Sequence, residues 1–275
     1  PAPPIAFHRA ARPGGMELGL ADDVALTTAS SAGLGGASAE SLACEGAHVT
    51  ICGRDLDRLA AAEKALKSVG PGDVLALEAD VTDPDDVERL VSETVERFGG
   101  LDHLVTSAGG PPPGSVLDLT DEDWYAAYDL LVMSVVRAVR AAHPHLADGG
   151  GTVTCIASRT VREPSSGLVL SNAVRRGVVG LVKTIAREFA PAVRTNAVLP
   201  GPFETGRIEG LIDHRVETGA YDSYEAGLVG FADGVPVGRI GDPQELGDTV
   251  AYLASDRASF VNGVALPVDG GAIRS

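Results

Sequence analysis

The sequence predicts an α/β fold in which helices cover both faces of one parallel sheet. Short apolar runs rich in β-branched residues alternate with amphipathic stretches along the chain, and the turn after the first run is rich in glycine. Strand–helix alternation indicates βαβ units, and right-handed crossovers place the connecting helices on both sides of the sheet. A chain of 275 residues suits a single domain of this kind.

The apolar runs predict a sheet of about seven strands. We expect strands at residues 24–28, 48–52, 74–78, 103–106, 152–156, 193–198 and 264–268. We expect helices at residues 33–45, 56–68, 84–98, 121–146, 166–189 and 243–254. Asp83-Pro84 and Asp242-Pro243 each place a capping aspartate before a proline, which marks a helix start. Residues 202–237 are polar and dotted with glycine, so we expect a lid or binding loop there.

The composition excludes several classes of function. A net charge of −16 disfavours nucleic acid and acidic membrane surfaces as partners, and no run approaches the ~18 apolar residues of a membrane helix. Cys44, Cys52 and Cys155 form no CxxC pair, which argues against a disulfide framework or a metal site and fits a reducing cytoplasm. Cys52 and Cys155 lie in apolar runs, where we expect buried side chains.

The first residues differ from the rest of the chain. Residues 1–15 contain proline, arginine and glycine but no apolar core of a signal peptide. We interpret them as an N-terminal extension or tag remnant, and we expect the domain to span residues 16–275.

The turn at residues 28–35 has the features of a dinucleotide site. Glycines there allow a pyrophosphate to approach the backbone, and the following helix N-terminus offers free N–H groups to an anion. The pattern therefore predicts a Rossmann-type doubly wound sheet. The residues expected to contact the cofactor in this turn are Thr28, Ser30, Ser31, Gly33, Leu34 and Gly35.

From Met16 onward the chain resembles the short-chain dehydrogenase/reductase family, and its 3-oxoacyl reductases in particular. Residues 28–35 are similar to the family's TGxxxGxG turn, with Ala29 in place of the first glycine, and residues 238–243 and 268–271 are similar to its C-terminal signature. Asp80-Val81 matches the pair beside the adenine, Ala108-Gly109 the end of the NNAG segment, and Pro200-Gly201 with Thr205 the PGxxxT segment beside the nicotinamide. The resemblance implies that these residues contact the cofactor.

Arg54 follows the second strand, where an acidic residue would bind the ribose hydroxyls of NAD. A basic residue there suits the 2′-phosphate of NADP instead. We therefore expect NADP(H) rather than NAD as the cofactor.

The resemblance also implies a catalytic site, but most of it is replaced. Ser158 stands at the position of the family's serine, whereas Ser171 and Arg175 stand where the family has the tyrosine and lysine of YxxxK, and Leu131 replaces its asparagine. Serine is a poor proton donor without a neighbouring base, and arginine stays charged. We expect Ser158, Ser171 and Arg175 to form an atypical catalytic site, with Arg175 also holding the cofactor ribose.

Three functions remain open at this point. The first is a redox enzyme on a carbonyl or hydroxyl substrate whose proton donor is Tyr221, Tyr224 or a serine with water. The second is a non-redox enzyme for elimination, isomerisation or cyclisation, in which Ser158 and Arg175 stabilise an anion. The third is a catalytically silent NADP(H)-binding protein.

We expect a small-molecule substrate and no nucleic acid or membrane partner. Arg159 and Arg162 follow Ser158 and either line the pocket for an acidic substrate or are solvated. The helices expected at 121–146 and 166–189 and the segment 260–268 resemble the family's subunit interfaces, which implies a homodimer or homotetramer.

Overall fold

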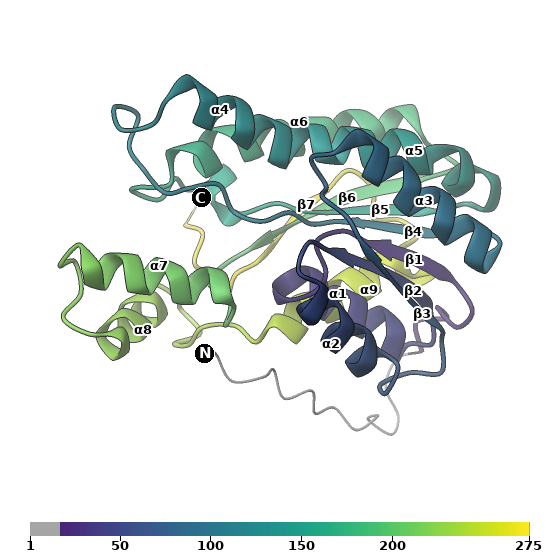
Figure 1. The fold of residues 1–275 in the computed structure, drawn as a ribbon, viewed down its shortest axis with the longest axis horizontal. Coiled ribbons are helices and arrows are strands. Elements are labelled where there is room, and N and C mark those ends of the chain that lie inside the picture. The colour runs from purple at the N-terminus through teal and green to yellow at the C-terminus, as the bar shows by residue number, and fades with distance from the viewer. Residues whose placement is uncertain (1–16, 275) are drawn as a thin grey trace.

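The structure is a computed structural model that describes residues 17–274, so the expected extension at residues 1–15 lies outside the described residues. A seven-stranded sheet has the order β3-β2-β1-β4-β5-β6-β7 (Figure 1). Every pairing is parallel. The strands are β1 (Val24–Thr27), β2 (His48–Gly53), β3 (Val74–Glu78), β4 (His103–Thr106), β5 (Thr152–Ile156), β6 (Arg194–Pro200) and β7 (Ala265–Val268). The predicted doubly wound α/β fold is confirmed.

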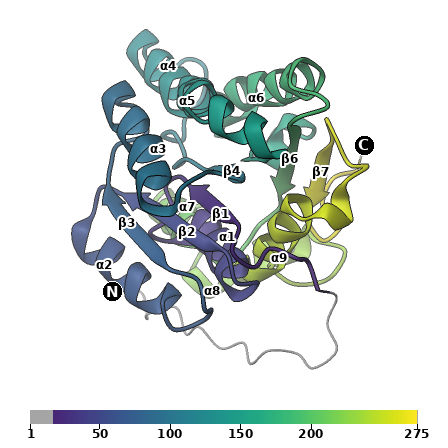
Figure 2. The ribbon, with the colours of Figure 1, turned by 90° about the vertical axis from the view of Figure 1, so that its right-hand side faces the viewer.

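Helices cover both faces of this sheet (Figures 1 and 2). One face carries α3 (Pro84–Phe98), α5 (Ser134–Gly149) and α6 (Val169–Glu188). The other face carries α1 (Gly33–Cys44), α2 (Leu56–Leu66) and α9 (Pro243–Ala254). Successive strand residues point to opposite faces, and Leu26 and Ala25 of β1 accordingly lie in different core clusters.

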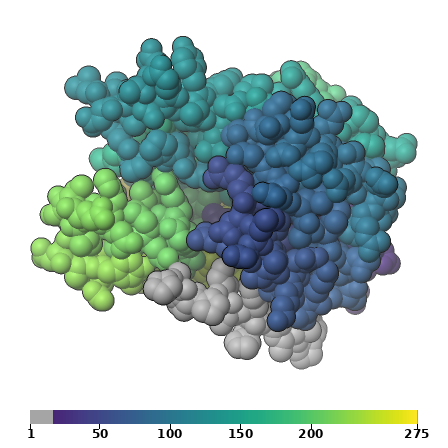
Figure 3. Space-filling model, in the orientation of Figure 1, coloured from purple at the N-terminus to yellow at the C-terminus, as the bar shows by residue number. Residues whose placement is uncertain are grey.

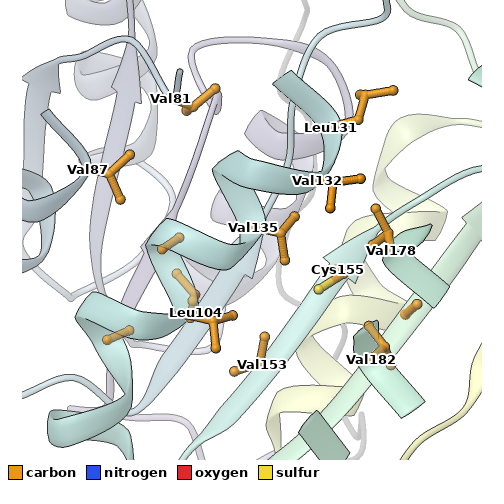
Figure 4. Close-up of a cluster of buried hydrophobic side chains, with 14 of the residues drawn as sticks. Val81, Val87, Leu104, Leu131, Val132, Val135, Val153, Cys155, Val178 and Val182 are labelled. Atoms are coloured by element: carbon orange, nitrogen blue, oxygen red, sulfur yellow. The ribbon is translucent and has the colours of Figure 1, made fainter. Parts of the chain in front are cut away.

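The core between the sheet and α5 and α6 consists of small and branched side chains (Figure 4). Leu104, Val153 and Cys155 from the strands meet Val135 of α5 and Val182 of α6. Only 4% of the chain is aromatic, so close packing of aliphatic side chains must supply most of the apolar burial. Burial raises the pKa of the Cys155 thiol to about 11, which keeps it neutral.

The helix expected at residues 121–146 is interrupted. α4 (Asp121–Tyr128) leads into a π-helical turn, Asp129–Met133, and the chain then continues as α5. Leu131 lies inside the turn and is buried in the core. The residue that the resemblance aligns with the family's asparagine is therefore an apolar core residue within the interruption.

Residues 202–237 were expected to form a lid or binding loop, and that role stays a prediction. The segment contains α7 (Gly206–Glu217) and α8 (Tyr224–Asp233), which lie together beyond the carboxyl ends of the strands (Figure 1). A side chain at Gly227 would place its Cβ 2.5 Å from Cγ2 of Ile212. This glycine, which favoured a loop in the sequence, instead permits close packing of the two helices.

The surface carries large apolar side chains on α4. Tyr125 is 73% exposed and Tyr128 is 51% exposed. The homodimer or homotetramer stays a prediction.

No helix within residues 17–274 is long and apolar enough to cross a membrane.

Candidate active site

A cavity of about 980 Å³ opens at the carboxyl ends of the central strands, between the sheet and the α7–α8 pair. Figure 3 shows the hollow between α7–α8 and the part of the surface that carries α4. Its size and its place at the switch point of the strand order are those of a ligand site in an open α/β sheet. The lining is drawn from residues 29–35, 53–58, 79–82, 107–110, 156–160, 165–175, 200–215 and 230–235, together with Ala126, Leu130 and Ala272.

The glycine-rich turn forms one wall of this cavity. Gly33 at the start of α1 has φ +61°, and the residue before it, Ala32, has no side chain that caps the first amides of the helix. These N–H groups are therefore available to an anionic ligand. Ala29 also has a positive φ, +46°, a conformation that glycine adopts without strain.

Two hydroxyls of the turn have structural partners. Thr28 Oγ1 donates to the carbonyl oxygen of Ser107 at 2.7 Å and accepts from its N–H at 2.8 Å, which ties the turn to the end of β4. Buried Ser30 accepts from the Cys52 N–H at 3.1 Å. Neither residue lines the cavity, whereas Ser31, Gly33, Leu34 and Gly35 do.

The far end of the cavity carries two arginines, each paired with an aspartate that also lines it: Arg54 with Asp80 and Arg58 with Asp55. The Arg54 side chain is 78% exposed, and its Nη1 lies 3.3 Å from Oδ2 of Asp80. Hydrogen bonds from Thr82 and the charge of Arg54 lower the pKa of Asp80 and keep it ionised. The Asp55 carboxylate caps α2 by accepting from the Arg58 N–H at 3.0 Å. Asp55 is the one carboxylate among residues 53–58 that lines the cavity, and it is engaged by Arg58.

A chain of hydroxyl groups lies at the end of β5. Thr160 donates to Ser158 Oγ from its backbone N–H at 3.2 Å and from Oγ1 at 3.0 Å, and Thr160 Oγ1 lies 3.5 Å from Ser171 Oγ. Because Thr160 donates to Ser158, the Ser158 hydroxyl keeps its own hydrogen for a third partner. Accepting two hydrogen bonds polarises that O–H group and strengthens it as a donor.

Arg175 joins the ends of β4 and β5. Its guanidinium donates to the carbonyl oxygens of Ile156 at 3.3 Å, Ala157 at 3.1 Å and Gly109 at 3.3 Å. Burial, and to a lesser extent the charge of Arg207, lowers the pKa of Arg175 to about 10, so it remains charged at neutral pH. Arg175 therefore places a fixed positive charge beside Ser158.

Arg207 extends from the first turn of α7 across the cavity. Its Nη2 donates to the Pro111 carbonyl oxygen at 3.0 Å. A Cβ at Gly110 would lie 2.5 Å from Arg207 Cζ, so the glycine leaves the space that the guanidinium fills. Sequence reasoning missed both Arg207 and Thr160, because only the chain trace brings α7 and the turn after Ser158 to one cavity.

The ionisable groups that line the cavity are arginines and two aspartates. Among residues 17–274, no tyrosine, lysine, histidine or glutamate lines it. Tyr221 and Tyr224 lie outside, and the Tyr221 hydroxyl is instead 3.1 Å from Nη1 of Arg215. The described residues also contain no cluster of three or more histidine, cysteine, aspartate or glutamate side chains that could hold a metal ion.

The cavity brings together most residues that the sequence predicted for the site. Arg162 lies outside and donates to the Ala265 carbonyl oxygen, but Arg159 lines the cavity. The predicted residues that line it are Ser31, Gly33, Leu34, Gly35, Arg54, Asp80, Val81, Ala108, Gly109, Ser158, Ser171, Arg175, Pro200, Gly201 and Thr205. Their functional roles stay predictions.

Comparisons with known proteins agree on one family. The family model described as enoyl-(acyl carrier protein) reductase matches residues 28–272. The chain is 33% identical over 256 residues to dehydrogenase/reductase SDR family member 4 of Oryctolagus cuniculus, covering 92% of this chain and 94% of that protein.

Two solved structures show the same likeness in three dimensions. L-Sorbose reductase from Gluconobacter frateurii, complexed with NADPH and L-sorbose, gives a TM-score of 0.89 at 32% identity, covering 94% of this chain and 100% of that one. A variant of actinorhodin polyketide ketoreductase with NADPH gives a TM-score of 0.87 at 31% identity, covering 92% and 98%.

Proposed function

Because the chain belongs to the short-chain dehydrogenase/reductase family of oxidoreductases, we propose that it is an NADP(H)-dependent enzyme that interconverts a carbonyl and a hydroxyl group through an atypical catalytic site. The observation that carries the proposal is the cavity, in which the glycine-rich turn and Arg54 lie at one end and Ser158 and Arg175 lie at the other. That arrangement suits a dinucleotide bound along the sheet edge with its reactive end beside Ser158.

The residues of the cofactor end fit NADP. The free first-turn amides of α1 suit the diphosphate, and Arg54 and Arg58 suit a 2′-phosphate. The Asp55 carboxylate is engaged as the cap of α2. The reductases in the two similar structures were crystallised with NADPH, which supports the same cofactor here.

When bound, NADPH supplies a hydride to a carbonyl carbon. In our proposal, the Ser158 hydroxyl donates a hydrogen bond to the substrate oxygen, oriented by Thr160. The charge of Arg175 stabilises the negative charge that develops on this oxygen. The proton reaches it from water through the hydroxyls of Ser171, Thr160 and Ser158, because no tyrosine or lysine among the described residues lines the cavity.

That lack of a conventional acid favours a second candidate, a non-redox enzyme on the same scaffold. Elimination, isomerisation or cyclisation requires an anion-stabilising group but no hydride transfer, and Ser158 with Arg175 would provide it. A panel of ketones and alcohols, followed by NADPH consumption or formation, separates the candidates. Turnover of any member of the panel supports the redox proposal, whereas tight NADPH binding without turnover favours the non-redox or silent protein.

Cofactor choice is tested by titration with NADPH and NADH. We expect Arg54→Gln to weaken NADPH binding about 10-fold, the effect of losing one charge-assisted contact, and to leave NADH binding unchanged. Arg97→Gln is the matched control, because Arg97 pairs with Asp73 outside the cavity. Equal loss of both cofactors in Arg54→Gln, or a preference for NADH in the native protein, would contradict the assignment of NADP.

A further inference from the structure

The half of the cavity that contains Ser158 is lined by arginine and by no acidic residue among residues 17–274. Arg159, Arg175, Arg207 and Arg215 line this half, and the two lining carboxylates, Asp55 and Asp80, lie at the other end. The chain has 22 lysines and arginines against 38 aspartates and glutamates, so its surface is acidic in general. A basic pocket in such a chain is a local feature that background composition does not explain.

Two of these cations lie close together without a carboxylate between them. Arg175 donates to the Gly109 carbonyl oxygen at 3.3 Å and Arg207 donates to that of Pro111 at 3.0 Å. Carbonyl groups two residues apart in a chain are separated by at most about 7 Å. No carboxylate lies within ion-pair distance of either guanidinium in the described part of the chain. An anionic ligand would relieve this repulsion.

Arg159 is the neighbour of Ser158 and lines the same cavity. Its side chain has no hydrogen bond or ion pair to any residue from 17 to 274, although it is partly buried. Arg207 has a single carbonyl partner, Pro111, and keeps other N–H groups for a ligand. A guanidinium presents these donors in a fork that matches carboxylate and phosphate oxygens.

We propose that the substrate carries an anionic group, a carboxylate or phosphate, which Arg159 and Arg207 bind while Ser158 holds the reacting oxygen. This inference rests on the proposed carbonyl chemistry. Phe203, Leu211 and Phe231 also line this half of the cavity and suit an apolar segment between the two polar ends.

The diphosphate of the cofactor is a competing source of negative charge for Arg207. Thr205 is close to Arg207 in the chain. A Cβ added at Gly33, in the glycine-rich turn, would lie 4.0 Å from Cγ2 of Thr205. The test must therefore separate substrate binding from cofactor binding.

The experiment is calorimetric titration of the full chain, with and without NADP⁺, using pairs of ligands that differ in charge. Pyruvate, acetoacetate and levulinate are each compared with the methyl ester, and dihydroxyacetone phosphate is compared with dihydroxyacetone. We expect at least one anion to bind about 10-fold more tightly than its neutral partner. Arg159→Gln and Arg207→Gln should each abolish most of that preference. Arg176→Gln should retain it, because this exposed arginine has the same charge and lies outside the cavity.

Equal binding of every pair by the native protein overturns the proposal, as does a preference that survives in both cavity variants. If Arg207→Gln weakens NADPH binding and leaves the preference unchanged, Arg207 serves the cofactor diphosphate and its assignment to the substrate is wrong. Because binding is measured without turnover, a failure to consume NADPH is a separate result that bears on the redox proposal alone.

Discussion

Thr160→Val tests the hydroxyl chain directly. Thr160 is 5% exposed and its Oγ1 lies 3.0 Å from Ser158 Oγ and 3.5 Å from Ser171 Oγ. Valine keeps the branched shape and the backbone N–H that donates to Ser158, so the change removes only the hydroxyl. Ser171, which is buried, is left without its side-chain partner.

The expected loss of stability follows from these contacts. The loss of one hydrogen bond and the buried hydroxyl left without a partner together lower the free energy of unfolding by about 1–3 kcal/mol. Urea denaturation followed by the fluorescence of Trp124 measures it. We also expect kcat for the best carbonyl substrate to fall about 10-fold, since Ser158 loses a partner that orients and polarises it.

Thr184→Val is the matched control, because the Thr184 hydroxyl bonds only to the Gly180 carbonyl oxygen on the exposed side of α6. It should change stability by less than about 0.5 kcal/mol and leave turnover unchanged. A Thr160→Val protein with native stability and native kcat would refute the idea that this chain of hydroxyls supports Ser158.

The double variant Ser171→Tyr/Arg175→Lys introduces the tyrosine and lysine of the family's YxxxK motif. If the reaction is carbonyl reduction, kcat measured by NADPH consumption should rise about 100-fold. A double variant that folds and binds NADPH but shows no gain in kcat would argue for a non-redox reaction. Ala29→Gly should stabilise the protein by about 1 kcal/mol in urea denaturation, because Ala29 has φ +46°; a loss of stability would show that the turn is not strained. Burial raises the pKa of Glu40 to about 7. The ionised carboxylate therefore destabilises the folded protein, and this penalty grows as the pH rises from the pKa of the unfolded state, 4.5, to about 7. Glu40→Gln should therefore stabilise the protein at pH above about 7 by up to about 3 kcal/mol and lose this advantage in acid. Glu88→Gln at an exposed position is the control, and equal effects of both substitutions would contradict the burial argument.

The fold was predictable because each local signal agreed with the global arrangement. The strand and helix of the first βαβ unit, the Asp83-Pro84 and Asp242-Pro243 helix starts, and the burial of Cys52 and Cys155 are all confirmed. These features depend on residues close in sequence. The π-helical turn around Leu131 packs against α6, and no local pattern in the sequence indicated it.

The candidate site was predictable only in part, for the same physical reason. Ser158, Ser171 and Arg175 were found by their positions in the family's pattern, and the structure brings them to one cavity. Thr160 needed the three-residue 3₁₀ turn after Ser158, Arg159–Val161, which turns its hydroxyl back toward Ser158. Arg207 needed α7 to form and to lie across Gly110.

The sequence by itself determined the sheet, its glycine-rich turn and the basic residue after β2, because each is encoded by a short motif or a hydrophobic period. Ser171 and Arg175, at the positions that resemble the family's tyrosine and lysine, were also found from the sequence. Only the tertiary structure decided which polar groups share a cavity. The glycine-dotted segment forms α7 and α8, and Tyr221 and Tyr224 lie outside the cavity. Arginines from separate segments of the chain line the cavity together with Ser158. Such convergence depends on contacts between residues far apart in the chain, which no local pattern records.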